Sequence, residues 1–102
     1  MNRVVLVAKA LSDPVRVRML EMLTQAADEA GAGKPGGMCV CHFVKELGMG
    51  QSRVSYHMRV LREAGLVAEL QVGKWTYYSL QRYALTGFIR DLEDRLTAAA
   101  GE

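Results

Sequence analysis

The sequence predicts a mainly α-helical fold with a β-hairpin wing, that is, a winged helix-turn-helix. Two observations support this fold class. Between Gln51 and Gly65, the apolar residues Val54, Met58 and Leu61 recur at helical spacing, and polar groups occupy the opposite face. Directly afterwards, two extended runs with aromatic and β-branched residues flank a glycine turn at 72–74, which indicates a hairpin with a basic tip.

The remaining elements follow from caps, breakers and periodicity. Asp13 suits a helix N-cap and Pro14 the first helical position, so one helix ends and another begins there. Glycine-rich residues 31–37 read as a loop. In chain order we expect helices over 4–11, from 14 toward 30, over 43–47 and over 51–65 with Gly65 as its cap, a hairpin over 66–80 and a last helix over 85–96.

Length and composition predict one domain that spans residues 1–102, because half of the residues are hydrophobic and can form one small core. The net charge is only +2, but basic residues outnumber acidic ones between 51 and 74. Lys9 and Asp13 interrupt the apolar start, and no apolar run is long enough to span a bilayer. We therefore expect a cytoplasmic protein without a membrane partner, whose two cysteines are thiols rather than a structural disulfide.

The polar face of the 51–65 helix predicts the partner, which is double-stranded DNA. A short helix and a glycine-containing link precede this helix, as in a helix-turn-helix. Its amide, hydroxyl and guanidinium groups are the types that read base edges and bind phosphates. The alternatives are an ordinary amphipathic surface helix and a hairpin that only covers the core. The predicted DNA-binding residues are Gln51, Ser52, Arg53, Ser55, Tyr56, Arg59, Arg62 and Lys74, with Arg53, Arg62 and Lys74 placed for phosphates.

Apolar helices at both ends exceed what a small winged domain needs for its own core. Such unpartnered stripes usually pack against another subunit, so we expect a homodimer that meets an operator with an inverted repeat. The alternative is that both helices complete the core of the monomer. The predicted dimerisation residues are Val4, Val7, Leu11, Leu85, Phe88, Ile89, Leu92 and Leu96.

The pair Cys39 and Cys41 is the second chemical feature. Thiolates bind soft ions such as trivalent arsenic and antimony, whereas a structural zinc site needs four ligands. On an ideal helix, residues i and i+2 point about 200° apart, so chelation by this pair is expected to disturb the helix start. The alternative is that both thiols are buried as small hydrophobic groups. Because no nucleotide loop, catalytic triad or carboxylate pair occurs, we do not expect an enzyme.

Several segments together resemble the ArsR/SmtB-type metalloregulatory repressors. The segment over 11–20, with its Asp-Pro-x-Arg core, is similar to the family's opening motif. Residues 52–58 are similar to its recognition helix, 61–67 to the signature before the wing, and 73–80 to the second wing strand. The resemblance implies a homodimeric winged helix that represses an operon and leaves DNA when its inducer binds.

The segment Met38-Cys39-Val40-Cys41-His42-Phe43 looks like the family's arsenic and metal box. The resemblance implies that Cys39 and Cys41 hold arsenite, antimonite or a trivalent organoarsenical whose third bond is already occupied. Val44 stands where some arsenic sensors carry a third cysteine, and His42 replaces an aspartate, which makes it a weaker candidate third ligand. The last helix lacks histidine, unlike the zinc and nickel sensors, and no permanent cofactor is expected.

Two other functions remain open at this point. The cysteine pair could serve a repressor of the same fold as a redox switch, through a disulfide or a persulfide bridge. A winged helix could also be a protein-interaction module, for which the steep salt dependence of phosphate binding is not expected.

Overall fold

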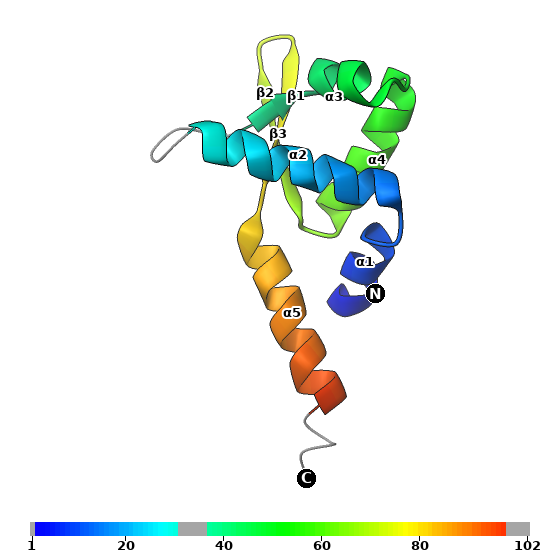
Figure 1. Ribbon diagram of the computed structural model, residues 1–102, viewed down its shortest axis with the longest axis vertical. Helices are drawn as coiled ribbons and strands as arrows, with labels where there is room; N and C mark the ends of the chain where they lie inside the picture. Colours follow the sequence, from blue (N-terminus) through cyan, green and yellow to red (C-terminus); the bar gives the residue numbers. More distant parts are fainter. Residues whose placement is uncertain (1, 31–36, 98–102) are drawn as a thin grey trace.

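The computed structural model describes residues 2–30 and 37–97 (Figure 1). The loop expected over 31–37 therefore lies, except for Gly37, outside the described residues. The elements are α1 (Arg3–Ala10), α2 (Pro14–Ala30), β1 (Gly37–Cys39), α3 (Val40–Leu47), α4 (Gln51–Glu63), β2 (Val67–Val72), β3 (Trp75–Leu80) and α5 (Arg82–Thr97). This arrangement confirms the predicted winged helix-turn-helix, with α3 and α4 as the helix pair and β2–β3 as the wing.

The helix boundaries follow the local chemistry of their end residues. The Asp13 side chain accepts a hydrogen bond of 2.8 Å from the Val15 backbone N–H, so the predicted cap before Pro14 is confirmed. At the end of α4, Gly65 has φ +79°, which L-amino acids with a side chain rarely adopt. Its N–H binds the Arg62 carbonyl and the Leu66 N–H binds the Leu61 carbonyl, which together form a Schellman motif.

The sheet has three antiparallel strands in the order β1-β3-β2, one strand more than the sequence predicts. Val72 pairs with Trp75 across a two-residue turn in which Gly73 has φ +60°, as the hairpin signal predicts. The extra strand, β1, pairs Cys39 with Tyr77 of β3. A strand of three residues is too short to show an alternating pattern along the sequence. The helix α3 begins at Val40, directly after this strand and three residues before the predicted start at 43.

One hydrophobic cluster joins α1, α2, α3, α4 and the wing. The recurring residues of α4 that predicted a buried face, Val54, Met58 and Leu61, are all fully buried in it. Phe43 of α3 and Met19 of α2 are the largest of the other fully buried side chains. Because α4 shares this cluster with the wing and α3, its orientation is set by the whole core.

The terminal helices α1 and α5 each contribute both buried and exposed residues. Val7, predicted at the dimer interface, is instead fully buried in the core of the monomer, because α1 packs against α4 and α5. Val4, Leu11, Phe88 and Leu92 are half-buried, and Leu11 and Phe88 pack against the core. Leu85, Ile89 and Leu96 remain exposed on α5, which extends away from the other elements in Figure 1. None of the described helices combines the length and the apolar character that crossing a membrane requires.

Candidate DNA-reading face and cysteine site

The helix α4 is the predicted reading helix, and its polar side is the predicted reading face. This face is open to solvent along its whole length. Every residue predicted to contact DNA, from Gln51 to Arg62 and at Lys74, is exposed. A groove of about 610 Å³ runs between this face and the wing. Six of the predicted residues line it, namely Gln51, Ser52, Ser55, Tyr56, Arg59 and Arg62, together with Val40, Glu69, Thr76 and Tyr78. Arg53 and Lys74 are not among the residues that line this groove.

A charged link that the sequence did not reveal connects α4 to the wing. The Arg62 guanidinium donates to the Glu69 carboxylate at 3.0 Å, and the Tyr78 hydroxyl donates to the same oxygen at 2.8 Å. Burial, and then the neighbouring Glu69, raise the pKa of Tyr78 to about 12, so this hydroxyl keeps its proton. Arg62, expected to be free for phosphates, is thus already paired with a carboxylate in the groove.

Two further cations lie over aromatic rings. The Arg59 guanidinium carbon is 5.7 Å from the centre of the Tyr56 ring, and the Lys74 Nζ is 5.3 Å from the centre of the Trp75 ring. These contacts hold positive charge near the groove and at the wing tip. Both positions suit groups that meet a phosphate backbone.

A buried pair behind the reading face was also missed by sequence reasoning. Arg16 donates to Nδ1 of His57 at 3.1 Å and to the carbonyl oxygens of Ala10 and Lys9 at 2.8 and 3.2 Å. Arg16 and His57 are both buried, and the Arg16 guanidinium also lies 3.6 Å from the Asp13 carboxylate. Arg16 therefore ties α4 to the junction between α1 and α2. Helical spacing contains no sign that Arg16 meets His57, because the two residues lie 41 positions apart along the chain.

The direction of the pKa shift of His57 favours the neutral form of this histidine. Burial, the largest cause, lowers the pKa of His57, and the positive charges of Arg16 and Arg53 lower it further against the opposing effect of Asp13. The hydrogen bond from the Val15 backbone N–H, with the nearby Arg16, lowers the pKa of Asp13. His57 consequently accepts at Nδ1 in its neutral form, which requires the proton to lie on Nε2.

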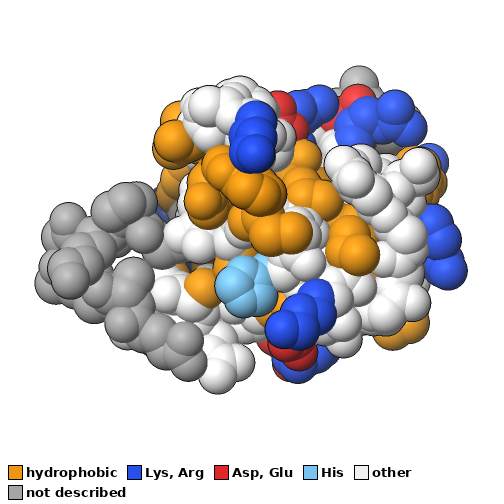
Figure 2. Space-filling model, turned by 90° about the horizontal axis from the view of Figure 1, so that it is seen from above, with side chains coloured by type: hydrophobic (Ala, Val, Ile, Leu, Met, Phe, Trp, Pro, Cys, Tyr) orange, Lys and Arg blue, Asp and Glu red, His pale blue; other side chains and the backbone are white. Residues whose placement is uncertain are grey.

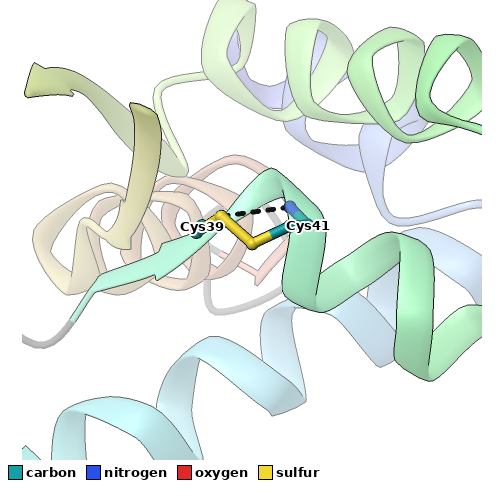
Figure 3. Close-up of a disulfide and its surroundings, with 2 residues drawn as sticks. All are labelled: Cys39 and Cys41. Atoms are coloured by element: carbon teal, nitrogen blue, oxygen red, sulfur yellow. Dashed lines mark hydrogen bonds between the residues drawn. A yellow bond between two sulfur atoms is a disulfide. The ribbon is translucent and has the colours of Figure 1, made fainter. Parts of the chain in front are cut away.

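The cysteine pair lies where β1 becomes α3, one helix before the reading helix. Cys39 is the N-cap of α3 and Cys41 lies in its first turn, and the two form a disulfide (Figure 3). The Cys41 backbone N–H donates to Cys39 Sγ at 3.2 Å, drawn as the dashed line in Figure 3. The expectation of two free thiols is therefore wrong for this structure. Cys39 is buried and Cys41 is exposed, so burial as small hydrophobic groups fits only Cys39.

The expectation that the two sulfurs point apart is also wrong, for a reason that concerns the backbone. Cys39 has φ −74° and ψ 150°, so it is extended and not helical. The periodicity of an ideal helix does not apply across this junction, and the sulfurs meet while α3 remains intact from Val40 onward. The Cα atoms of the pair are 5.3 Å apart.

No larger ligand set forms around the pair. Within residues 2–30 and 37–97, no three side chains of His, Cys, Asp or Glu come together in a way that could hold a metal ion. His42, the candidate third ligand, is exposed and is not gathered with the two cysteines into such a group. The site thus brings together two sulfurs without a third such side chain beside them in the described part of the chain.

Known proteins give a consistent comparison. Residues 13–69, more than half of the chain, match the model of the arsR family of bacterial regulatory proteins. An uncharacterised HTH-type transcriptional regulator of Methanocaldococcus jannaschii is 34% identical over 69% of this chain and 68% of its own length. The arsenical resistance operon repressor of Bacillus subtilis is 30% identical over 81% of this chain and 70% of its own length. The arsenic resistance transcriptional regulator ArsR1 of Pseudomonas putida is 33% identical over 74% of this chain, which spans only 52% of that protein.

Solved structures show the same architecture. A possible transcriptional regulator for arsenical resistance superposes with a TM-score of 0.68 at 29% identity, over 87% of this chain and 81% of the other. A homodimeric winged helix-turn-helix DNA-binding domain from Mycobacterium bovis also has a TM-score of 0.68, at 23% identity, over 94% of this chain and 83% of the other. These relatives are DNA-binding regulators and not enzymes, as the sequence predicts. The chain belongs to the arsR family of bacterial transcriptional regulators.

Proposed function

We propose that this protein is a dimeric transcriptional repressor that leaves its operator when arsenite, antimonite or a trivalent organoarsenical binds Cys39 and Cys41. The observation that carries this proposal is the meeting of two sulfurs at the start of α3, one element before the reading helix. Arsenical resistance regulators at about 30% identity support the choice of inducer. One unit would both read DNA and sense the inducer, in the cytoplasm where the operator lies.

The DNA-reading half of the proposal rests on the groove between α4 and the wing. Ser52, Ser55, Tyr56 and Arg59 present hydroxyl and guanidinium groups at an exposed helix face, as base readout requires. Lys74 at the wing tip supplies a charge for phosphate. The exposed apolar residues of α5 support a dimer, in which two α4 helices would meet two half-sites of an inverted repeat.

A mechanical link between sensing and reading follows from the contacts. In the reduced protein the two sulfurs are not bonded to each other, so an arsenic atom bound to both would fix the position of Cys39, at the end of β1, relative to Cys41, in the first turn of α3. α3 packs against α4, and β1 pairs with β3, which carries Tyr78 and through it the Glu69–Arg62 link to α4. Inducer binding would shift the population toward an arrangement in which α4 is misplaced, by as much as its affinities for the two states differ.

Titration of operator complexes tests the proposal. The reduced protein is bound to DNA from upstream of its own gene, and arsenite or antimonite is added while fluorescence anisotropy follows release. We expect release by the wild type and none by Cys39→Ser or Cys41→Ser. Serine at position 39 keeps an acceptor for the Cys41 N–H, so α3 retains its cap. Unchanged release by both variants would show that the cysteines are not the sensor.

The disulfide itself favours a second candidate function, a thiol redox switch. In this alternative, oxidation of the two thiols releases two protons and two electrons to an oxidant and holds β1 and α3 together. Mass spectrometry after treatment with diamide should then show the loss of two hydrogens, and operator affinity should differ between the two forms. Equal affinity of the oxidised and the reduced protein would eliminate this candidate while leaving metalloid sensing intact.

A further inference from the structure

A second hollow lies between the β1–α3 junction and the wing. It measures about 360 Å³, and Cys39 and Cys41 form part of its wall. This volume lies within the range of small-molecule pockets and exceeds that of cavities known to hold a benzene ring. Figure 2 looks onto this end of the molecule and shows hydrophobic side chains gathered there, with lysine and arginine side chains around them.

The lining has a distinct chemistry. Val40 and Val44 of α3 and Trp75 of the wing supply apolar surface, and 47% of the Trp75 surface is exposed. Lys45 and Lys74 add positive charge, and the described lining residues include no carboxylate. An exposed tryptophan beside aliphatic groups favours a flat apolar ligand, and the two lysines disfavour a cationic one. Gln51, the first residue of the reading helix, also lines this hollow.

We propose that this hollow binds the aromatic group of a trivalent aryl arsenical whose arsenic atom is held by Cys39 and Cys41. The inference rests on the proposed function and narrows its inducer to one class. An arsenic atom on both sulfurs has one bond left, and both cysteines line the same hollow as Trp75. A ring in it would be withdrawn from water and would occupy space next to Gln51 and Lys74, which the DNA-reading face also needs.

Binding of the aryl arsenical requires reduction of the disulfide but no change in the oxidation state of arsenic. A thiol or phosphine reductant first opens the disulfide by supplying two electrons, and the two cysteines take up two protons. The dihydroxy aryl arsine then exchanges two As–O bonds for two As–S bonds. The two thiol protons leave with the hydroxides as two waters, and arsenic stays trivalent.

The test compares phenylarsonous and methylarsonous acid on the phosphine-reduced protein bound to its operator. Both compounds have a carbon at the third arsenic bond and react with the thiols in the same way. The ratio of the concentrations at which they release DNA therefore measures the effect of the aromatic ring. We expect phenyl to release DNA at a concentration roughly tenfold lower than methyl. Trp75→Thr should bring this ratio toward one. Leu70→Thr, which removes an exposed apolar residue of the same sheet outside the hollow, should leave it unchanged.

A second measurement needs no variant. Trp75 is the only tryptophan, so its fluorescence reports on the hollow directly. We expect a larger spectral change with the phenyl than with the methyl compound. Equal spectra, or a phenyl-to-methyl ratio that persists in Trp75→Thr, would overturn the aryl site while arsenite release still supports the proposed function. Failure of arsenite and both organic compounds to release DNA would overturn the two together.

Discussion

At the scale of single residues, the Arg16–His57 pair is the position where chemistry and fold are most tightly joined. A buried guanidinium needs hydrogen-bond partners, and each of the three Arg16 nitrogens has one, from two carbonyl oxygens and an imidazole nitrogen. The arrangement works only while His57 is neutral, because a protonated ring has no acceptor to offer Arg16. A single proton therefore opposes the contact that fixes α4 against α1 and α2.

This dependence predicts that stability falls in mild acid. The pKa of His57 is lowered in the folded protein, so between that pKa and 6.5 the unfolded chain binds a proton that the folded chain does not. The free energy of unfolding is then fully retained above pH 6.5 and decreases as the pH falls below it. The lowered pKa of Asp13 acts only below about pH 3.8 and does not interfere. Thermal unfolding between pH 7.5 and 5.5 measures the effect.

The substitution His57→Asn tests whether the loss of stability in mild acid comes from protonation of His57. The asparagine oxygen can replace Nδ1 as the acceptor for Arg16, but it does not titrate. We expect a lower melting temperature at pH 7.5 and a weaker decrease toward pH 5.5 than in the wild type. The matched control is His42→Asn, because His42 is exposed and outside the network, and it should keep the full decrease. An unchanged decrease in His57→Asn would assign it to another group.

At the scale of elements, Gly65 ends α4 and allows the chain to turn into the wing. Gly65 has φ +79°, and a Cβ there would lie 2.7 Å from Nη1 of Arg3. Gly65→Ala should therefore cost about 1–2 kcal/mol of stability in denaturant unfolding, chiefly from the left-handed backbone. Gly87→Ala is the control, since its Cβ would meet nothing within 4 Å and a helix interior favours alanine by about 0.5–1 kcal/mol. Equal effects of the two substitutions would contradict the argument.

The link between α4 and the wing gives a prediction about DNA affinity. Glu69 places a carboxylate in the groove that is proposed to receive DNA, where it pairs with Arg62 and accepts from Tyr78. Glu69→Gln should remove the repulsion of phosphates and free Arg62 to bind one. We expect tighter binding to all sequences, and we expect the slope of log affinity against log salt to become more negative by about one.

Glu63→Gln is the matched control for this experiment, because Glu63 is exposed on α4 but does not line the groove. It should change the slope less than Glu69→Gln does. Weaker binding by Glu69→Gln would mean that the link holds α4 in its reading position rather than restraining Arg62. Anisotropy titrations at several salt concentrations distinguish these results.

At the scale of the whole molecule, α5 leaves an apolar face without a partner in the described part of the chain. Leu85, Ile89 and Leu96 are exposed, although water contact with such side chains is unfavourable. A second copy would cover this face. Ile89→Asp should therefore produce a monomer in sedimentation experiments and lower the affinity for a two-half-site operator by about 100-fold. Thr86→Asp, exposed on the same helix, is the control, and a dimeric Ile89→Asp would place the interface elsewhere.

The sequence by itself determined the family and all of the elements except β1. Local signals suffice for these, because caps, turn glycines and apolar spacing act within a few residues. Asp13 caps the start of α2, Gly65 ends α4 and Gly73 forms the hairpin turn, as predicted. Spacing also identified the exposed face of α4 and the cysteine pair. These are properties that neighbours in the chain decide.

Only the tertiary structure decided which of these groups meet. β1 exists because β3 pairs with it, and its extended Cys39 brings two sulfurs together that helical spacing would keep apart. Val7 is buried in the core, Arg62 pairs with Glu69, and Arg16 donates a hydrogen bond to His57, 41 residues away along the chain. Such contacts depend on how distant elements pack in three dimensions, and no periodicity along the chain records them.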